Sequence, residues 1–287
     1  MKRIEINNPS YPQLLKQIPS APKELCYKGS WDNSLFENCL AVVGSRRMTS
    51  YGRQITERLV SEIASAGLTI VSGFMYGVDA TAHKAALGVG GKTIAVMPCG
   101  IDVIHPSHQE KLYNDILENN GLIISEFEGN HPPALWTYPK RNKIVAGLSK
   151  AVMVTEAASK SGSLITAGLA LEYRRGIFAA PGPITSSLSE GTLGLIKDGA
   201  IMVTSAKEIL DYYGIVSPLS SRDSRQFLNL SKLEEAIVIK LQQESISIDD
   251  MSRLLGVGAA EMGTTLSLMQ LKGMLFEEDG KYHIKLG

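Results

Sequence analysis

The residues with the clearest chemical potential are Arg46 and Arg47, in the segment LAVVGSRRMTSYG (residues 40–52). An apolar, β-branched run ends there in a turn of small residues, and an amphipathic pattern follows. This order is typical of a first parallel strand feeding a helix, and it predicts a helix N-terminus that can hold a phosphate. A dinucleotide-binding turn would continue as G-x-G-x-x-G, whereas here no glycine follows Gly44 until Gly52. The turn therefore offers cations to a phosphate backbone.

Other groups that can bind phosphate follow later strand-like runs. Ser72 and Gly73 form a second turn, where glycine lets the backbone come close to a ligand. Lys160, Ser161 and Gly162 precede a helical pattern that begins at about residue 164. That order predicts another anion-binding helix N-terminus.

The segment TYPKRNK (residues 137–143) places cations beside aromatic rings. Lys140, Arg141 and Lys143 surround Asn142 and follow Tyr138. This combination suits single-stranded nucleic acid, because cations follow the phosphates while rings stack on unpaired bases. An ordinary exposed loop would also carry such charges, but the aromatic neighbours favour a binding role.

Catalytic and metal-binding interpretations have less support. Asp79 and His83 are four residues apart and would share a helix face, but no third group accompanies them, so we interpret them as structural. Glu156 lacks a matched acid and is expected to orient a turn. The other histidines show no metal-ligand spacing. We predict no catalytic residue, no metal and no cofactor; Arg47 is also compatible with a solvated surface charge.

Strand-like runs alternate with helical patterns from residue 40 to about residue 210. The expected strands are 40–43, 69–71, 93–96, 122–125, 151–154, 176–179 and 200–203; the clearest helices are 51–66, 79–87, 109–118 and 164–174. Apolar strands covered by helices predict an α/β fold, an extended Rossmann-like doubly wound parallel sheet. Ligands bind at the carboxyl ends of the strands in such sheets, where the turns described above fall.

The chain divides into four expected parts. Residues 1–39 form an extension packed on the core, 40–214 the Rossmann-like DNA-binding domain, and 215–230 a serine-rich linker. Residues 231–287 read as helices at 233–243, 248–255 and 259–271, then a hairpin that turns at Asp279-Gly280. Three helices and a hairpin predict a C-terminal winged-helix domain.

Charge and cysteine usage limit the function further. The 287 residues carry a formal net charge of zero, so any basic site must be local. Residues 231–287 hold nine acidic and six basic residues, a net charge of −3, which disfavours duplex recognition by that part. Three scattered cysteines suit a reducing cytoplasm, and no signal or membrane-length segment is present. We expect a cytoplasmic protein with no membrane partner.

Seven sequence blocks in the same order resemble the DNA-processing protein A family (DprA, also called Smf). They are VVGSRRMTSYG, VSGFMYGVDATAH, GKTIAVMPCGIDVIHP, ISEFEGNHPP, YPKRNKIVAGLS, VTEAASKSGSLITAGLALEYRRGIFAAPG and GTLGLIKDGA. The resemblance implies a non-enzymatic protein that forms homodimers and binds single-stranded DNA. It also implies that the protein protects incoming DNA and helps load the RecA recombinase in natural transformation.

Family motifs carry over to particular positions. The arginine of the family's Gly-Ser-Arg turn is Arg46. The family's P-x-R-N-R segment matches residues 139–143, with Lys143 in the last place. Its Ser-Gly-Ser turn matches residues 161–163, which Lys160 precedes. Ser107 stands where some relatives place a lysine, which puts that contact in doubt.

Three other functions compete with DNA binding. A nucleotide phosphoribohydrolase of the same sheet type would keep a glutamate where Leu169 stands. A nicotinamide dehydrogenase would need a closer glycine pattern and an acidic residue after the second strand. A winged-helix regulator with a small-molecule sensor is disfavoured by the acidic C-terminal part.

Overall fold

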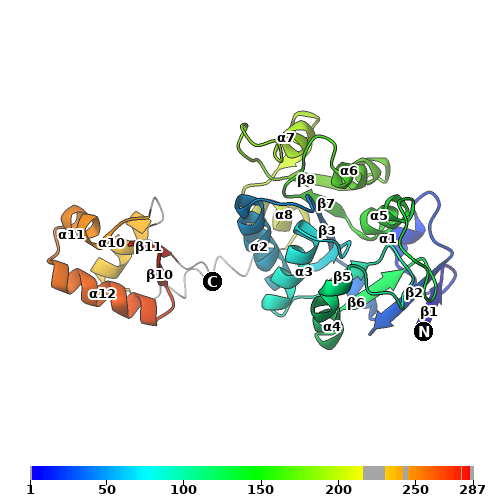
Figure 1. The fold of residues 1–287 in the computed structure, drawn as a ribbon, viewed down its shortest axis with the longest axis horizontal. Coiled ribbons are helices and arrows are strands. Elements are labelled where there is room, and N and C mark those ends of the chain that lie inside the picture. Colours follow the sequence, from blue (N-terminus) through cyan, green and yellow to red (C-terminus); the bar gives the residue numbers. More distant parts are fainter. Residues whose placement is uncertain (1, 216–229, 242–244, 279, 285–287) are drawn as a thin grey trace. The chain divides into compact units, whose positions relative to one another are not determined.

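The computed structural model describes residues 2–215, 230–241, 245–278 and 280–284. The chain forms two compact units, residues 1–217 and 218–287, each of which is described by itself (Figure 1). The boundary between them falls inside the expected linker, of which residues 216–229 lie outside the described residues.

The first unit is built on one sheet that has nine strands among the residues described. The strands are β1 (Lys2–Glu5), β2 (Glu24–Gly29), β3 (Cys39–Val43), β4 (Thr69–Ser72), β5 (Thr93–Val96), β6 (Leu122–Ser125), β7 (Ala151–Val154), β8 (Gly176–Ala179) and β9 (Ile201–Met202). The helices are α1 (Gln13–Lys16), α2 (Ser50–Ser65), α3 (Val78–Gly88), α4 (Glu110–Glu118), α5 (Thr137–Leu148), α6 (Gly162–Glu172), α7 (Glu190–Lys197) and α8 (Ala206–Tyr212), with short 3-10 helices at Asn33–Phe36 and Ser107–Gln109.

The strand order is β1-β2-β6-β5-β4-β3-β7-β8-β9. From the central β3, the chain adds β4, β5 and β6 on one side and then β7, β8 and β9 on the other, all in parallel. This topology confirms the predicted doubly wound α/β sheet. The N-terminal residues extend it, because β2 pairs antiparallel with β6 and β1 with β2.

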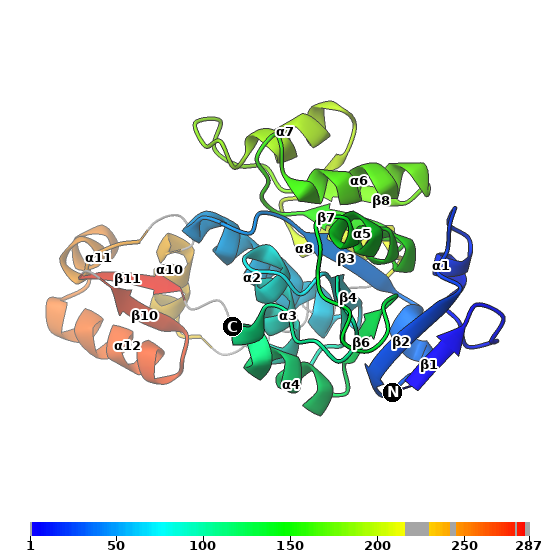
Figure 2. The ribbon, with the colours of Figure 1, turned by 45° about the vertical axis from the view of Figure 1, so that its right-hand side comes forward.

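Helices cover both faces of the sheet (Figure 2). In β3, Leu40 and Val42 pack in the cluster that includes α2, α3 and α8, whereas Ala41 and Val43 pack in the cluster that includes α1, α5 and α6. Alternate residues of a strand point to opposite faces, so a continuous apolar run is what a strand buried on both sides requires.

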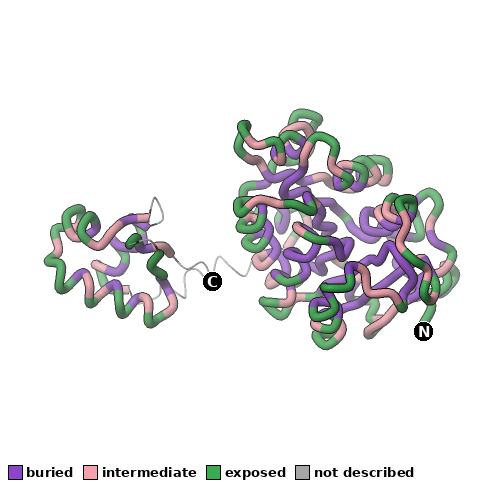
Figure 3. Tube along the Cα trace, in the orientation of Figure 1, coloured by how far each residue is buried: buried purple, intermediate pink, exposed green. Residues whose placement is uncertain are grey.

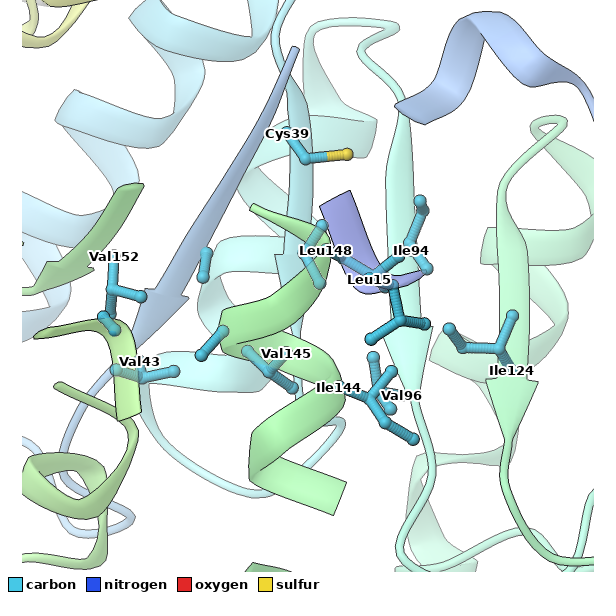
Figure 4. Close-up of a cluster of buried hydrophobic side chains, with 14 of the residues drawn as sticks. Leu15, Cys39, Val43, Ile94, Val96, Ile124, Ile144, Val145, Leu148 and Val152 are labelled. Atoms are coloured by element: carbon cyan, nitrogen blue, oxygen red, sulfur yellow. The ribbon is translucent and has the colours of Figure 1, made fainter. Parts of the chain in front are cut away.

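Helix α5 was not predicted, and its position matters for the site. Its apolar residues begin only at Ile144, and Ile144, Val145 and Leu148 pack into a core cluster with strand residues such as Val43 (Figure 4). Pro139 lies in the first turn, where a helix has no use for the missing backbone N–H. The basic segment is therefore the polar first half of a helix whose second half is fixed by the core.

The second unit contains three helices, α10 (Lys232–Leu241), α11 (Ile248–Leu255) and α12 (Ala259–Leu271), and two antiparallel strands, β10 (Leu275–Glu278) and β11 (Lys281–Ile284). It has its own buried core, as Figure 3 shows by colour. The element order is the one expected for a winged helix, and that assignment stays a prediction. Asp279, in the expected hairpin turn, lies outside the described residues.

In the described part of the chain, no helix is both long enough and apolar enough to cross a membrane. Cys26, Cys39 and Cys99 are buried and unpaired.

Candidate nucleic-acid interface

A pocket of about 580 Å³ opens where β3, β4 and β7 end. These strands are neighbours in the sheet. The chain runs from β3 to β4 on one side and returns from β6 to β7 on the other, so the pocket lies at the topological switch point. Its lining unites the turns singled out in the sequence: Gly44, Ser45, Arg46, Arg47, Gly73, Arg141, Asn142, Lys160, Ser161 and Gly162, with Met75, Asp79, Tyr138 and others. Ser72, Lys140 and Lys143 are not part of this lining.

The turn that carries Arg46 and Arg47 is held by backbone contacts. The Ser45 N–H donates to the Glu156 carbonyl oxygen at 2.7 Å, and the Ser45 carbonyl accepts from the Val78 N–H at 3.2 Å. Gly77 has φ +69°, and a Cβ there would lie 2.2 Å from the Ser45 carbonyl oxygen. Only glycine allows this approach, so the two arginines project from a turn with a defined backbone.

Arg46 stacks on an aromatic ring of α5. Its guanidinium carbon lies 5.0 Å from the centre of the Tyr138 ring, and the Tyr138 hydroxyl is 2.9 Å from His105 Nε2. Burial, together with the Arg46 charge, lowers the pKa of His105. The histidine is therefore neutral at pH 7 and adds no charge, while the ring of Tyr138 orients the arginine.

Three cations of the pocket carry unneutralised charge. Arg46, Arg47 and Lys160 are exposed, and within the part of the chain that the structure describes none of them forms an ion pair. Their positive charge faces a concave surface, where field lines concentrate and attract an anionic ligand.

The N-terminus of α6 opens into the same pocket. Ser161 caps the helix, accepting from the Ser163 N–H at 3.3 Å, and its hydroxyl lies 2.7 Å from the Ser163 hydroxyl. Gly162, the first residue of α6, is exposed. The predicted helix N-terminus is therefore present. Free N–H groups and the helix dipole at such an end favour an anion, and anion binding there stays a prediction.

The N-terminus of α2 is closed, so the prediction of a phosphate there is wrong. The Glu156 carboxylate accepts from the Thr49 N–H at 2.8 Å and from the Thr49 hydroxyl at 2.6 Å. Gly52 leaves room for it, since a Cβ would lie 2.5 Å from a Glu156 carboxylate oxygen. A carboxylate of the protein takes the place that a nucleotide phosphate holds in dinucleotide-binding folds.

Arg141, Gly73 and Ser72 form the floor of the site and not its binding surface. Arg141 is 5% exposed, and its guanidinium donates to the carbonyls of Gly73 and, at 3.0 Å, Val96. A Cβ on Gly73 would lie 1.7 Å from Arg141 Nη1, so glycine is needed to seat the guanidinium. Burial lowers the pKa of Arg141, although Asp79 opposes the shift.

Ser72 is fully buried, and its hydroxyl donates to the Val42 carbonyl at 2.7 Å. The sequence pattern places Ser72 among the groups that can bind phosphate. For its hydroxyl this is wrong, because the group is inaccessible and already bonded to the Val42 carbonyl. Asn142 lines the pocket and accepts from Arg141 Nε at 3.1 Å, which helps to orient the arginine.

Asp79 and His83 bind separate partners. Asp79 accepts from the Met75 N–H at 3.2 Å, and burial raises its pKa while the Arg141 charge counteracts the shift. His83 Nδ1 lies 2.7 Å from the Thr93 hydroxyl, and burial lowers the pKa of His83 to about 3. Each group holds backbone or hydroxyl partners inside the fold.

Lys143 and Lys140 share one carboxylate. Lys143 Nζ lies 3.2 Å from Glu126 Oε1 and donates to the Ser20 carbonyl at 3.1 Å, and its side chain is only 14% exposed. The expected DNA contact of Lys143 is therefore corrected to an ion pair inside the fold. Lys140 lies 3.5 Å from the same oxygen but is 42% exposed.

Sequence reasoning missed Glu126 and the contact of His105 with Tyr138. A signal for Glu126 was present, because it directly follows the run 122–125 and so had to lie at the carboxyl edge. Among the described residues, no cluster of three or more His, Cys, Asp or Glu side chains is arranged to hold a metal ion.

Fold and site define a Rossmann-like α/β protein whose carboxyl edge bears an open, cationic pocket. Within that class, the chain belongs to the DNA recombination-mediator protein A family, whose sequence model matches residues 2–214. It is similar to protein Smf of Escherichia coli K12, with 37% identity over 285 residues, which cover 97% of this chain and 76% of that protein.

Two solved structures are also similar. The X-ray structure of DNA processing protein A from Streptococcus pneumoniae has 40% identity and a TM-score of 0.69, covering 73% of each chain. A structure of DNA processing protein A from Helicobacter pylori, described as revealing a single-stranded DNA binding mode, has 32% identity and a TM-score of 0.66. That match covers 74% of this chain and 95% of the other.

Proposed function

We propose that this protein binds single-stranded DNA in the carboxyl-edge pocket without chemical turnover. The proposal rests on one observation: Arg46, Arg47 and Lys160 gather around the open N-terminus of α6. None of these three cations forms an ion pair with a residue that the structure describes. Each would contact a phosphate, and Ser161 and Gly162 would add hydroxyl and backbone donors.

The pocket favours an unpaired strand over a duplex. Its volume of about 580 Å³ suits a nucleotide-sized group and not a double helix. The Tyr138 ring beside Arg46 offers a stacking surface, which an unpaired base can use and a paired base cannot. The binding mode described for the Helicobacter pylori relative supports the same choice.

The described pocket is poorly equipped for hydrolysis. Its lining includes one acidic residue, Asp79, which is buried and bonded to the Met75 N–H. Leu169, at the position where a phosphoribohydrolase keeps its glutamate, packs against the core. The enzyme alternative predicts that the protein releases free base from nucleoside monophosphates, which chromatography of the incubation mixture would detect.

Fluorescence anisotropy with labelled oligo-dT and the matching duplex tests the proposal. We expect tighter binding of the single strand, and a loss of roughly tenfold or more for Arg46→Glu, because a phosphate contact becomes a repulsion. For Arg46→Glu, the plot of log affinity against log salt concentration should be less steep than for the wild type, by about 0.7 in the magnitude of its slope, because one phosphate contact is lost. Lys84→Glu is the matched control, since it makes the same charge change at an exposed site outside the pocket. Equal affinity for both strand states, or an unaffected Arg46→Glu variant, would refute the proposal.

We extend the proposal to recombination. The protein would act as a cytoplasmic homodimer that protects incoming DNA and helps RecA to load on it during natural transformation; the family's description as a recombination mediator supports this role. RecA ATP hydrolysis on DNA coated with single-strand binding protein should start sooner when this protein is added, and light scattering should give twice the monomer mass. We also keep the expected domain division as part of this proposal: an N-terminal extension (1–39), a Rossmann-like domain (40–214), a linker (215–230) and a winged-helix domain (231–287).

A further inference from the structure

A cluster of three aromatic side chains lies at the carboxyl end of β6, outside the pocket. Phe127 stacks on His131 with ring centres 4.8 Å apart and an interplanar angle of 13°. Trp136 meets both at steep angles, 81° to Phe127 and 68° to His131, at 5.6 and 5.7 Å. Phe127 is buried, whereas Trp136 is 56% exposed. A buried phenyl ring and a partly buried imidazole thus support an indole that is open to a ligand.

The backbone under this cluster is fixed before any ligand arrives. Phe127 and Gly100 form a parallel bridge, the Gly100 N–H donates to the His131 carbonyl at 2.8 Å, and the Ile101 N–H donates to the Phe127 carbonyl at 3.2 Å. A Cβ on Gly100 would lie 2.1 Å from the Gly129 carbonyl oxygen, so the two loops touch. A preformed surface loses little conformational freedom when it binds.

A cation stands over the cluster. Lys140 lies one helical turn after Trp136, and its ammonium is 5.1 Å from the Phe127 ring centre and 6.0 Å from that of Trp136. Glu126 lies within 3.5 Å of Lys140 but also pairs with Lys143. Two ammonium groups and one carboxylate leave a net positive charge beside the exposed indole.

The cluster and the pocket adjoin each other. Trp136 is the N-cap residue of α5, and Tyr138, two residues later, already lines the pocket. The start of this one helix therefore separates two surfaces that combine an aromatic ring with a cation: Arg46 with Tyr138 and Lys140 with Trp136.

The geometry points to a second nucleotide subsite, in which an unpaired base of the strand held in the pocket stacks on Trp136 while its phosphate pairs with Lys140. This inference rests on the proposed single-strand binding and deepens it. It implies that the bound strand runs along the carboxyl edge of the sheet from the pocket at β3 to the aromatic cluster at β6. Stacking needs only a π-face, so the subsite would accept any base.

Tryptophan fluorescence tests the subsite. The chain has two tryptophans, and Trp31 is half-buried, with its indole N–H donated to the Ser10 carbonyl. Oligo-dT should quench the emission of the wild-type protein, the matching duplex should not, and the Trp136→Leu variant, which keeps Trp31, should show no quenching. Quenching that persists in this variant would overturn the inference.

Affinity separates this inference from the proposed function. Trp136→Leu should bind a long oligo-dT about 5- to 160-fold more weakly but bind a very short one, which fills only the pocket, like the wild type. Trp136→Phe should restore most of the loss, and Leu171→Ala, an exposed apolar change at the far end of α6, should have no effect. Wild-type affinity of Trp136→Leu for every length refutes the subsite alone, whereas failure of the wild type to bind any oligonucleotide refutes the proposed function.

Discussion

At the scale of single residues, the site separates cations that face the ligand from cations that build the fold. Arg46 and Lys160 are exposed at the pocket, whereas Arg141, from an equally basic segment, is buried and bonded to two carbonyls. The guanidinium of Arg141 joins the ends of β4 and β5 to α5. A residue of this kind supports binding by holding the turns in place.

Gly73→Ala should destabilise the protein by about 1–3 kcal/mol, because the new Cβ would displace the Arg141 guanidinium and leave buried carbonyls without a donor. Urea unfolding measures the free-energy difference. Gly168→Ala is the control, since no atom lies within 4 Å of the Cβ it adds and an alanine inside α6 should be neutral or stabilising by up to about 1 kcal/mol. Equal stabilities for the two variants would contradict this role of Gly73.

At the scale of elements, three helix N-termini approach the site and differ in what fills them. Glu156 closes α2, Asp79 binds the turn before α3, and α6 alone among these three opens into the pocket with a hydroxyl cap. Anion binding is thereby directed to one helix end, and the chain's own carboxylates exclude a ligand from the other two.

Glu156→Ala should lower the free energy of unfolding by about 1.5–3 kcal/mol, since the Thr49 N–H and hydroxyl lose a charged acceptor at the start of α2. The control is Glu172→Ala, an exposed carboxylate in the last turn of α6, for which a change within about 0.5 kcal/mol is expected. Thermal and urea unfolding of both variants provide the comparison. If Glu172→Ala lost stability and Glu156→Ala did not, the proposed role of Glu156 at the start of α2 would be contradicted.

Sequence patterns predicted the parallel strands but did not predict every helix or contact. The positions of the seven parallel strands along the chain were predictable, because strands buried on both faces are apolar throughout and their turns contain small residues. Their order within the sheet was not predicted. Helix α5 was missed, since its first half is polar and contains Pro139. The pairing of Lys143 with Glu126 and the burial of Arg141 depend on contacts between segments distant in sequence, and charge alone does not reveal such contacts.

At the scale of the whole molecule, a formal net charge of zero is compatible with a cationic site, since the unneutralised charges gather at one edge of the sheet. Stability depends on pH through a buried group. The buried histidine of α3, His83, must stay neutral for the fold to persist.

Stability should fall below pH 6.5 partly because of His83. Its pKa is about 3 in the folded protein against 6.5 in a free side chain, so the unfolded state binds the proton first and stability is lost as the pH falls through this window. Between pH 7 and pH 5 this group accounts for about 2 kcal/mol. Urea unfolding across pH should show a shallower acid slope for His83→Asn than for the wild type; parallel slopes would contradict the assignment.

The proposed function requires that an unpaired strand lies in the pocket at the carboxyl edge of β3, β4 and β7. Photo-crosslinking of an iodouracil-substituted oligonucleotide, followed by peptide mapping, tests it most directly. We expect crosslinks in residues 44–47, 136–143 and 158–166, and their loss in Arg46→Glu. Crosslinks confined to residues 231–287, or to the opposite edge of the sheet around residues 88–91, would contradict it.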